Sequence, residues 1–437
     1  MTALAATRYD AYKDSGTEWM GEIPAHWVVG RLKDFAAANP TSKIPRDLSA
    51  EDVVEFVPMT NVDEELGVIR EFNMVPFAQV ASGYKRFQNG DVIFAKITPC
   101  MENGNCAVVS GLSRNIGFGS TEFLVYRPKQ CLGSSFLHYF LHNDLFRKNA
   151  VAFMKGSAGQ KRLPGDYVET HVFPLPPFSE HQAIAAYLDA KTAQIDRKID
   201  LLAQKAVKYR QLKQSLINQA VTRGLDKSAP TRDSGIAWIG QIPAYWEVSA
   251  ITNIVTPVSI KNHPSEELLS VYRDYGVIIK STRDDNHNRA GSNLADYKLV
   301  EPGFLVINKM KAWQGSLGIS AFRGIVSPAY VTCKPTGRVV DPSYLHHLLR
   351  SQTFIDEYNR LSYGVRVDQW DMRYDEFKYI PVLLPPLDEQ KLIGEYIESK
   401  TLHIDRLVNT INFQIDKLKE LRRAMINDVV TGKLRIA

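Results

Sequence analysis

Two proline motifs in this sequence resemble part of a methyltransferase active site. An enzyme that methylates amino groups carries Asn or Asp, then Pro-Pro, then Tyr or Phe, and the first side chain accepts hydrogen bonds from the target amine. LPPF at Leu175 and LPPL at Leu384 place leucine where that acceptor must lie. We therefore expect this chain not to be the methyltransferase itself.

Two glycine motifs could in principle bind a cofactor or a nucleotide. GFGS at Gly117 is a lone G-x-G without the strand, helix and acidic residue that surround it in a dinucleotide site. GSAGQKR at Gly156 has too short a spacing between its glycines for a phosphate-binding Walker loop. We expect no cofactor to bind to this chain.

Histidine and acidic motifs give no clear catalytic or metal site. His138 and His142 are four residues apart, but no H-E-x-x-H glutamate lies between them, and His346-His347 in the second half breaks the spacing. We interpret the histidines as an ordinary pair, buried or at the surface. Glu389-Gln390-Lys391 matches the end of a nuclease motif, yet it begins a long helical segment, so we expect it on the helix surface. No catalytic residue and no metal ligand is predicted.

Basic and aromatic residues alternate in three segments, at residues 83–87 (GYKRF), 153–162 (FMKGSAGQKR) and 308–313 (NKMKAW). Lys and Arg side chains bind phosphates, while Gln, Asn and Arg hydrogen-bond to base edges in the major groove of DNA. For any single lysine, a solvated loop position is the alternative. The candidate DNA-binding residues are Lys85, Arg86, Lys96, Lys155, Gln160, Lys161, Arg162, Lys298, Lys309 and Lys311.

The chain that must position these residues is an internal duplication. KDSGTEWMGEIPAHW at residues 13–27 returns as RDSGIAWIGQIPAYW at residues 232–246. LPPFSEHQAIAAYLDAKTAQIDRKID from Leu175 returns as LPPLDEQKLIGEYIESKTLHIDRLVN from Leu384. Each half therefore runs from a WxGxIPxxW entry, through a variable stretch, to an LPP exit and a charged helical segment.

The variable stretches are distant relatives of each other. GYKRFQNGDVIFAKI from Gly83 aligns with DYKLVEPGFLVINKM from Asp296. The alignment retains two lysines in each half: Lys85 with Lys298, and Lys96 with Lys309. Lys96 and Lys309 are the strongest individual candidates, since most of their neighbours changed.

The segments after each LPP predict two long helices of about 40 residues, each roughly 60 Å long. Neither Gly nor Pro occurs from Glu180 to Thr222, and apolar residues recur at steps of three and four. The first stripe comprises Ile184, Leu188, Ile195, Ile199, Leu202, Ala206, Tyr209, Leu212 and Leu216, and the second Ile393, Ile397, Ile404, Val408, Ile411, Ile415, Leu418, Leu421 and Met425. The two stripes favour pairing of the helices with each other, and separate packing of each helix on its own domain is the alternative.

Short β-prone runs precede a helical stretch in the first variable region. The runs are Val53–Val57, Asp91–Lys96, Ala107–Ser110 and Phe123–Arg127, and the helical stretch covers about Ser135–Lys148. They predict mixed α/β (α+β) domains of about 150 residues each. The expected divisions of the chain are residues 1–174, 175–228, 229–383 and 384–437.

Bulk composition supports a water-soluble protein of several domains. The 437 residues exceed one typical core, and no apolar run approaches the roughly 20 residues that span a bilayer. No secretory signal is recognisable at the N-terminus, so we expect a cytoplasmic protein without a membrane partner. Four scattered cysteines form no C-x-x-C pair, and a net charge of +5 is only modestly basic.

Taken together, the WxGxIPxxW entries, the LPPxxEQ-like exits, the repeated IDR helices and the duplication resemble the specificity subunits of type I restriction–modification systems. The resemblance covers nearly the whole chain. It implies target-recognition domains at about residues 13–174 and 232–383, each recognising one half of a split, asymmetric DNA site. It also implies two long helices that pair antiparallel and separate these domains. The first exit departs slightly from the second, with SEHQ at Ser179 where the second has DEQ at Asp388.

The resemblance places the chemistry on partner subunits. It implies two methyltransferase subunits that carry S-adenosylmethionine, and restriction subunits that use ATP and Mg²⁺. The helices and the entry segments would be their docking surface. Two alternatives remain open at this stage: a scaffold whose domains bind protein, and a self-sufficient enzyme.

Overall fold

The computed structural model divides the chain into two compact units. The first comprises Met1–Leu201 with Phe413–Ala437, and the second comprises Leu202–Asn412. Each unit therefore contains the beginning of one long helix and the end of the other. The residues described are 7–157, 159–283, 291, 293–364 and 370–436. Across these residues, no helix combines the length and the apolar character that crossing a membrane requires.

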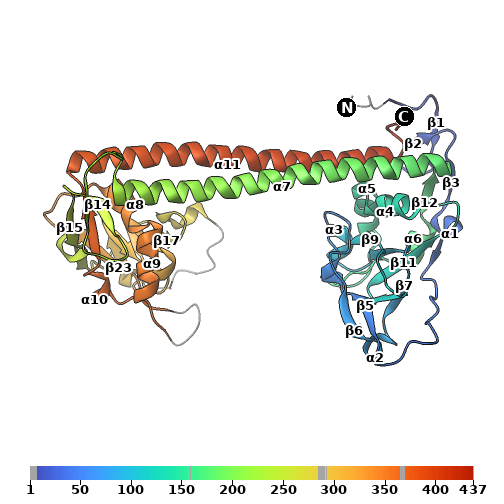
Figure 1. The fold of residues 1–437 in the computed structure, drawn as a ribbon, viewed down its shortest axis with the longest axis horizontal. Coiled ribbons are helices and arrows are strands. Elements are labelled where there is room, and N and C mark those ends of the chain that lie inside the picture. The colour runs from blue at the N-terminus through green and yellow to red at the C-terminus, as the bar shows by residue number, and fades with distance from the viewer. Residues whose placement is uncertain (1–6, 158, 284–290, 292, 365–369, 437) are drawn as a thin grey trace. The chain divides into compact units, whose positions relative to one another are not determined.

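The first unit consists of small sheets covered by short helices (Figure 1). Its strands are β1 (Tyr12–Asp14), β2 (Glu22–Pro24), β3 (Val28–Arg31), β4 (Ala36–Ala38), β5 (Val53–Val57), β6 (Asn73–Pro76), β7 (Lys85–Phe87), β8 (Val92–Ala95), β9 (Cys106–Val108), β10 (Gly117–Gly119), β11 (Phe123–Pro128) and β12 (Val172–Leu175). Its short helices are α1 (Leu32–Phe35), the 3-10 turn η1 (Met59–Asn61), α2 (Phe77–Val80), α3 (Cys100–Asn103), α4 (Ser134–His142), α5 (Asp144–Val151) and α6 (Gly165–Thr170).

Two four-stranded sheets form the centre of this unit. One has the order β4-β11-β8-β9 and is antiparallel throughout. The other has the order β6-β5-β10-β7, and its β5–β10 pair is parallel. Phe94, Phe136, Phe140 and Phe146 are fully buried, so β8, α4 and α5 share one core. The four predicted strand runs are confirmed as β5, β8, β9 and β11.

The predicted helix at Ser135–Lys148 is two helices in the structure. Asn143 has an extended backbone between α4 and α5, and its side chain accepts a hydrogen bond from Phe146 N (3.0 Å). This is the geometry of an N-cap, for which asparagine is among the preferred residues. The helical spacing of apolar residues continues from α4 into α5, so the sequence pattern gave no sign of the break at Asn143.

The second unit repeats this order of elements. Its strands are β13 (Thr231–Asp233), β14 (Gln241–Pro243), β15 (Glu247–Ala250), β16 (Val255–Val258), β17 (Leu269–Tyr272), β18 (Gly276–Ile279), β19 (Lys298–Val300), β20 (Leu305–Ile307), β21 (Leu317–Ile319), β22 (Gly324–Val326), β23 (Val331–Pro335) and β24 (Pro381–Leu384). Its short helices are the 3-10 turns η2 (Ile251–Asn253), η3 (Lys280–Thr282), η4 (Leu294–Asp296) and η5 (Ala312–Gln314), followed by α8 (Pro342–Leu349), α9 (Gln352–Leu361) and α10 (Tyr374–Phe377).

The sheet topologies of the two units match strand for strand. The order β16-β23-β20-β21 repeats β4-β11-β8-β9. The second sheet of the first unit is represented by two pairs, β17-β18 and β19-β22, joined by an isolated parallel bridge between Leu268 and Ile325. Both halves of the duplication therefore have the same mixed α/β fold, as the sequence predicts.

Strand pairing joins the two ends of each variable region. Strand β3, just after the first WxGxIPxxW motif, pairs antiparallel with β12, which contains the leucine of LPP. Strands β15 and β24 make the same pair in the second unit. The entry and the exit of each domain thus lie side by side, which explains why both recur in the sequence.

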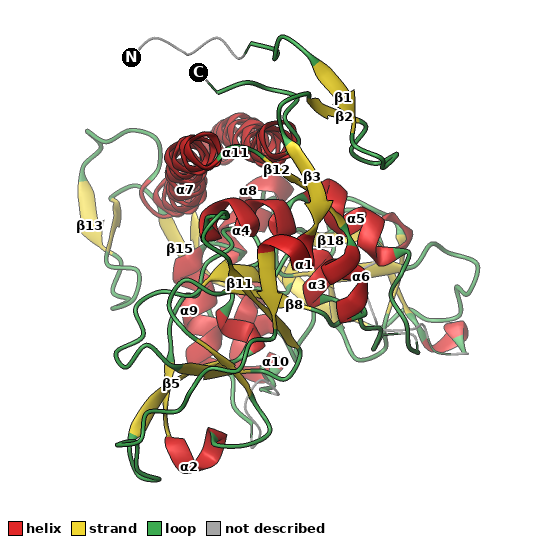
Figure 2. Cartoon of the chain, turned by 90° about the vertical axis from the view of Figure 1, so that its right-hand side faces the viewer, coloured by secondary structure: helices red, strands yellow, loops and turns green. Residues whose placement is uncertain are grey.

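Two long helices follow the LPP motifs, α7 (Phe178–Arg223) and α11 (Leu387–Val430). In the first unit Ile184 and Leu188 of α7 share a core with Ile426 and Val429 of α11. The second unit contains the reciprocal arrangement, where the end of α7 shares a core with the beginning of α11. Within each unit the two helices therefore run antiparallel. Figure 2 shows α7 and α11 end-on, lying side by side.

Ion pairs repeat across the two helices. Arg422 Nε lies 3.1 Å from Asp196 Oδ1 in the first unit, and Lys213 Nζ lies 2.7 Å from Asp405 Oδ2 in the second. The two aspartates are those of the repeated IDR sequence, so this recurrence has a structural cause.

One part of the predicted stripe is wrong. Leu212 and Leu421, at equivalent positions, are 46% and 55% exposed. A straight helix of 3.6 residues per turn rotates a seven-residue pattern by about 20° per heptad, so the apolar spacing drifts away from the helix contact.

Candidate nucleic-acid interface

The two lysines that the duplication retains lie close together in the first unit. Lys85 begins β7 and its Nζ donates to Asn39 Oδ1 (2.8 Å). Burial lowers the pKa of Lys85, and the positive charge of Lys96 lowers it further. Two half-buried ammonium groups that repel each other favour binding of an anion.

One carboxylate partly balances this charge. Glu122 Oε2 lies 3.9 Å from Lys96 Nζ, while Arg162 makes a two-pronged contact with the same carboxylate, with Nε at 3.0 Å and Nη2 at 2.8 Å. The hydrogen bond from Arg162 lowers the pKa of Glu122. Lys96 and Arg162 thus share the Glu122 carboxylate, and Lys85 lies close to Lys96, so the three cations keep an excess of positive charge.

The remaining candidates of this unit surround the cluster. Lys155 and Arg162 pair through their backbones, with N···O distances of 3.0 and 2.8 Å, and so close the base of a glycine loop. Lys155, Gln160 and Lys161 are exposed on that loop. Arg86 is half-buried and donates to Ala81 O (2.9 Å), so it is a weaker candidate than the others.

The second unit repeats the lysine pair. Lys298 begins β19 and donates to Tyr330 O (2.6 Å), and its pKa is lowered by burial and then by the charges of Lys261 and Lys309. Lys309 Nζ lies 3.3 Å from Asp371 Oδ2. Lys311, also predicted, is exposed nearby. The duplication therefore places two lysines and one carboxylate together in both units, although the carboxylates come from different positions.

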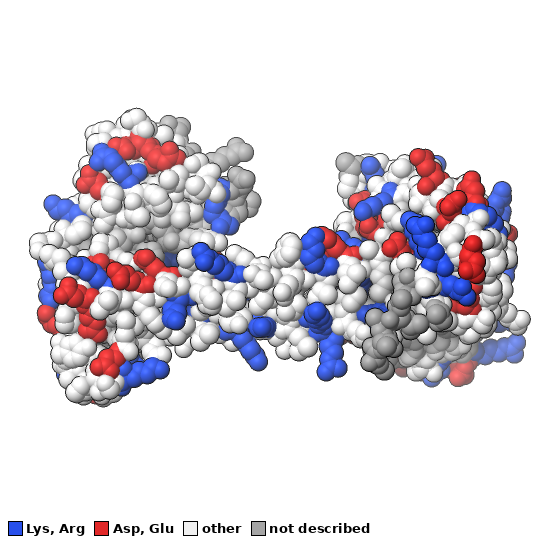
Figure 3. All heavy atoms as spheres, turned by 90° about the horizontal axis from the view of Figure 1, so that it is seen from above, with Lys and Arg blue, Asp and Glu red and all other residues white. Residues whose placement is uncertain are grey.

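On the face that Figure 3 shows, acidic and basic side chains are mixed over the domains. Blue side chains with few red ones occupy the visible part of the long helices. On this face the domains therefore carry no patch of a single charge as large as the basic stretch on the long helices.

The glycine motifs serve packing. A Cβ atom at Gly117 or Gly119 of β10 would lie 2.6 or 2.8 Å from the Phe87 ring, so glycine lets this ring approach the strand. Gly156 has φ +131°, and a Cβ there would lie 2.8 Å from Gln160 O. Burial raises the pKa of the Cys106 and Cys333 thiols, and all four cysteines are unpaired.

Sequence reasoning missed a clamp at the start of each long helix. Trp27 Nε1 donates to Glu180 Oε1 (3.0 Å), and Trp246 Nε1 donates to Glu389 Oε2 (3.1 Å). Burial by itself raises the pKa of Glu180, but hydrogen bonds from Tyr9, His26 and Trp27 give a net lowering. The recurrence of both the tryptophan and the glutamate was the signal that could have found this contact.

Each clamp also holds the end of the other long helix. Gly432, just after α11, has φ +72°, and a Cβ there would meet Pro24 and Trp27. Gly224, just after α7, would meet Glu389 and Trp246 in the same way. The WxGxIPxxW motif thus fixes the antiparallel helix pair to its domain.

The prediction that Glu389-Gln390-Lys391 lies on the helix surface is wrong for two of the three residues. Glu389 is half-buried in the clamp, and Gln390 is 3% exposed. Gln390 accepts a hydrogen bond from Asp341 N (2.9 Å) and donates to Pro385 O (2.8 Å). These residues join the N-terminus of α8 to that of α11, because both helix ends carry unsatisfied backbone groups.

His181 makes the equivalent contacts in the first unit. Its Nε2 accepts from Gly133 N (3.1 Å), and its Nδ1 lies 3.3 Å from Pro176 O. Burial lowers the pKa of His181, which favours the neutral ring that this pattern needs. Where the first exit reads SEHQ and the second DEQ, His181 therefore replaces Gln390, and both side chains can donate and accept hydrogen bonds.

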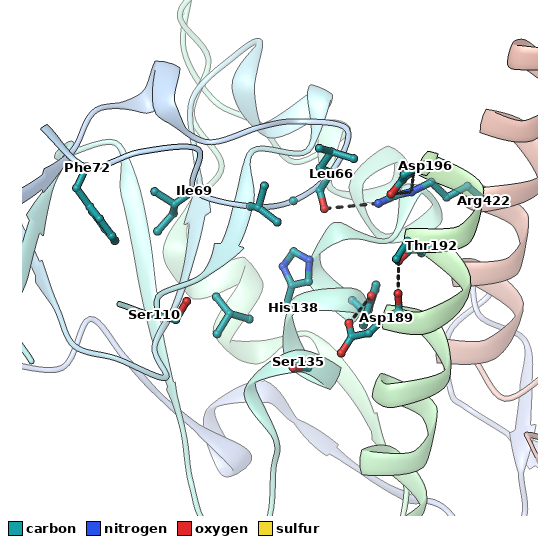
Figure 4. A pocket seen from close by; sticks show the side chains of 15 residues that line it. Leu66, Ile69, Phe72, Ser110, Ser135, His138, Asp189, Thr192, Asp196 and Arg422 are labelled. Carbon is teal, nitrogen blue, oxygen red and sulfur yellow. Dashed lines mark hydrogen bonds and ion pairs between the residues drawn. The ribbon is translucent and has the colours of Figure 1, made fainter. Parts of the chain in front are cut away.

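A recess of about 540 Å³ lies where loop 66–72 and α4 meet the long helices of the first unit (Figure 4). His138 lies at its centre, with its pKa lowered to about 4 by burial and by Arg422. Arg422 is tied to Asp196, and Tyr139 donates to Asp189 (2.7 Å). Nowhere in the described chain do three His, Cys, Asp or Glu residues cluster as metal ligands. His138 and His142 are both buried.

Comparison with known proteins agrees with this architecture. Residues 24–206 match the family model of the type I restriction modification DNA specificity domain. The putative type I restriction enzyme MjaX specificity subunit of Methanocaldococcus jannaschii is 23% identical over 95% of this chain and 96% of its own length. Residues 24–206 are thus similar to the type I restriction modification DNA specificity domain, and the chain as a whole is similar to type I restriction enzyme specificity subunits.

Over a shorter segment, sequence identity to another specificity subunit is higher. The type I restriction enzyme EcoAI specificity subunit of Escherichia coli is 36% identical over 164 residues, which are 37% of this chain. This segment covers 27% of the EcoAI subunit, and a match to the EcoEI specificity subunit of the same species, at 32% identity, also covers 27% of that relative.

Solved structures of the family share the fold. A chain from a structure on complex assembly and conformational transition of the type I R-M system has a TM-score of 0.71 and 19% identity, covering 93% of this chain and 98% of that one. The HsdS subunit from Thermoanaerobacter tengcongensis has a TM-score of 0.55 and 18% identity, covering 94% and 98%.

Proposed function

We propose that this chain is the DNA-recognition subunit of a type I restriction–modification complex. Each unit recognises one half of a split, asymmetric site in double-stranded DNA. The observation that carries this proposal is the lysine pair, Lys85 with Lys96 and Lys298 with Lys309, at matching positions of two copies of one fold. Two neighbouring cations with one nearby carboxylate keep a net positive charge, which attracts a DNA phosphate. Binding of that phosphate releases counterions from the DNA.

The long helices set the separation of the two half-sites. With 46 residues, α7 is about 69 Å long at 1.5 Å per residue. Buried clamps at both ends favour a fixed length over a flexible linker. The spacing between half-sites then follows from geometry, as it does for dimeric DNA-binding proteins.

Catalysis takes place on partner subunits. Two methyltransferase subunits carry S-adenosylmethionine, restriction subunits use ATP and Mg²⁺, and the complex acts on DNA in the cytoplasm. Exposed apolar side chains on the long helices, among them Leu201, Leu402 and Phe413, supply a surface for such partners.

Mapping of methylated sites tests this function. Genomic DNA is sequenced from cells that express this chain with its methyltransferase subunit, and from cells that express the methyltransferase alone. A new motif with two short defined halves and a fixed gap is expected. A stable complex with an active methyltransferase but without a new motif would overturn the proposal and favour the protein-binding scaffold.

A further inference from the structure

In each unit an antiparallel backbone bridge closes a loop, and the side chains at this loop base differ sharply between the two units. In the second unit Tyr363 and Asp371 form the bridge that Lys155 and Arg162 form in the first. Both bridges stand beside the retained lysine: Met372 N donates to Lys309 O (3.1 Å), and Leu163 N donates to Lys96 O (2.7 Å). The two loop bases are therefore equivalent places on the proposed DNA surface.

The second unit has aromatic residues where the first has charged ones. Trp313 and Trp370 have ring centroids 5.0 Å apart, and the Arg373 guanidinium lies 4.9 Å from the centre of the Tyr363 ring. Tyr363 is 44% exposed, and both tryptophans are half-buried. In the first unit Lys155 and Lys161 take the places of Tyr363 and Trp370, because they hold the same positions in the equivalent bridge.

The aromatic residues also lie among cations. Lys309, Lys311 and Arg373 flank them in the chain, and Lys311 and Arg373 are exposed. Trp313 Nε1 is buried without a hydrogen-bond partner, which leaves one donor of this cluster unused. Positive charges around an apolar surface match the phosphates and the apolar part of a DNA groove.

We propose that Trp313, Trp370 and Tyr363 form an apolar contact surface with which the second unit recognises the 5-methyl group of a thymine in its half-site. The aromatic faces carry no donor or acceptor for base edges, and the thymine methyl is the apolar group of the major groove. An intact duplex is favoured as the ligand, because stacking on an extruded base would first cost unpairing. The first unit, with Lys155 and Lys161 in these places, recognises polar base edges instead.

This inference rests on the proposed function, and its test begins with the mapped site. Duplexes are prepared in which each thymine of the second half-site is replaced in turn by deoxyuridine, which lacks only the methyl group. Binding to the full chain with its methyltransferase subunits is measured by fluorescence anisotropy. One replacement is expected to weaken binding about fourfold, the effect of one buried methyl-sized group.

Variants assign that effect to the aromatic surface. Trp370→Ala is expected to bind the thymine and deoxyuridine duplexes equally, whereas Trp370→Phe keeps a distinction. The matched control Lys161→Ala, at the equivalent position of the first unit, leaves the fourfold effect intact. Thermal unfolding of each variant establishes that the second unit is folded.

Three outcomes would overturn the inference while leaving the proposed function standing. They are a second half-site without thymine, equal binding of all deoxyuridine duplexes by the unaltered protein, and an undiminished effect in a folded Trp370→Ala variant. Absence of any split methylation motif would instead overturn the proposed function.

Discussion

The two units keep the same supporting contacts while changing the residues that make them. His181 and Gln390 each accept from the backbone of a short helix and lie against a proline carbonyl. Asp196 pairs with arginine and Asp405 with lysine across the helix pair. Exchanges at these positions preserve hydrogen-bonding capacity or charge, because the geometry of the fold requires it.

The loop bases behave in the opposite way. Lys161 and Arg162 of the first unit correspond to Trp370 and Asp371 of the second, so that charge, size and polarity all change. The backbone bridge beneath them stays. The difference fits the proposal that packing constrains the supporting structure, whereas the residues at the loop base follow the half-site that each unit would recognise.

The largest effect is expected from loss of the clamp tryptophans. Trp27→Ala and Trp246→Ala each remove a fully buried side chain and leave a half-buried glutamate without its indole donor. Each lowers the free energy of unfolding by about 3–5 kcal/mol. Denaturant titration measures both, and a large difference between the two variants would break the equivalence of the units.

Exchange of His181 for other side chains sharpens the comparison. His181→Ala leaves Gly133 N without its acceptor and lowers the free energy of unfolding by about 1–3 kcal/mol. His181→Gln introduces the side chain of the second unit and is expected to restore most of this loss. If glutamine is no better than alanine in thermal unfolding, the two positions are not interchangeable.

The helix ion pairs differ in burial and therefore in expected strength. Arg422 is 9% exposed, whereas the Lys213 and Asp405 side chains are 31% and 52% exposed. Arg422→Met is expected to cost about 1–2 kcal/mol of unfolding free energy, and Lys213→Met less than about 1 kcal/mol. Urea titration of both variants checks the order, and the reverse order would contradict it.

Loss of one retained lysine should weaken DNA binding without changing its sequence preference. Lys96→Ala or Lys309→Ala removes one phosphate contact, so the slope of log affinity against log salt becomes shallower by about 1. Filter binding at several salt concentrations measures this slope. Lys148→Ala, which removes an exposed lysine paired with Asp144, serves as the control and leaves the slope unchanged.

The smallest expected effect is a pH dependence of DNA binding. Burial and Lys96 lower the pKa of Lys85 in the free protein, and a bound phosphate favours the charged form and raises that pKa again. Binding therefore takes up a proton at alkaline pH, and affinity falls as the pH rises. In a double variant, Lys85→Met with Lys298→Met, titration calorimetry should detect less proton uptake than in the unaltered protein.

Much of the fold could be predicted from the sequence. Strand runs such as Val53–Val57, and the long helices, follow from local patterns of apolar residues. The pairing of β3 with β12 and the burial of Gln390 depend on contacts between distant segments, which local patterns do not contain. Of the proposed site, the lysine pairs were found because the duplication retains them, whereas Trp370 was missed because nothing in the first unit resembles it.

The central claim is that the domain which recognises DNA can be exchanged without changing the helices and clamps that support it. Transfer of one domain from a relative tests this claim. Residues 32–171, between β3 and β12, are replaced by the equivalent segment of a relative with a different site, and methylated sites are mapped in cells with the methyltransferase subunit. The account predicts that one half of the motif changes while the other half and the gap stay the same. A stable chimaera that changes both halves, or changes neither, would contradict it.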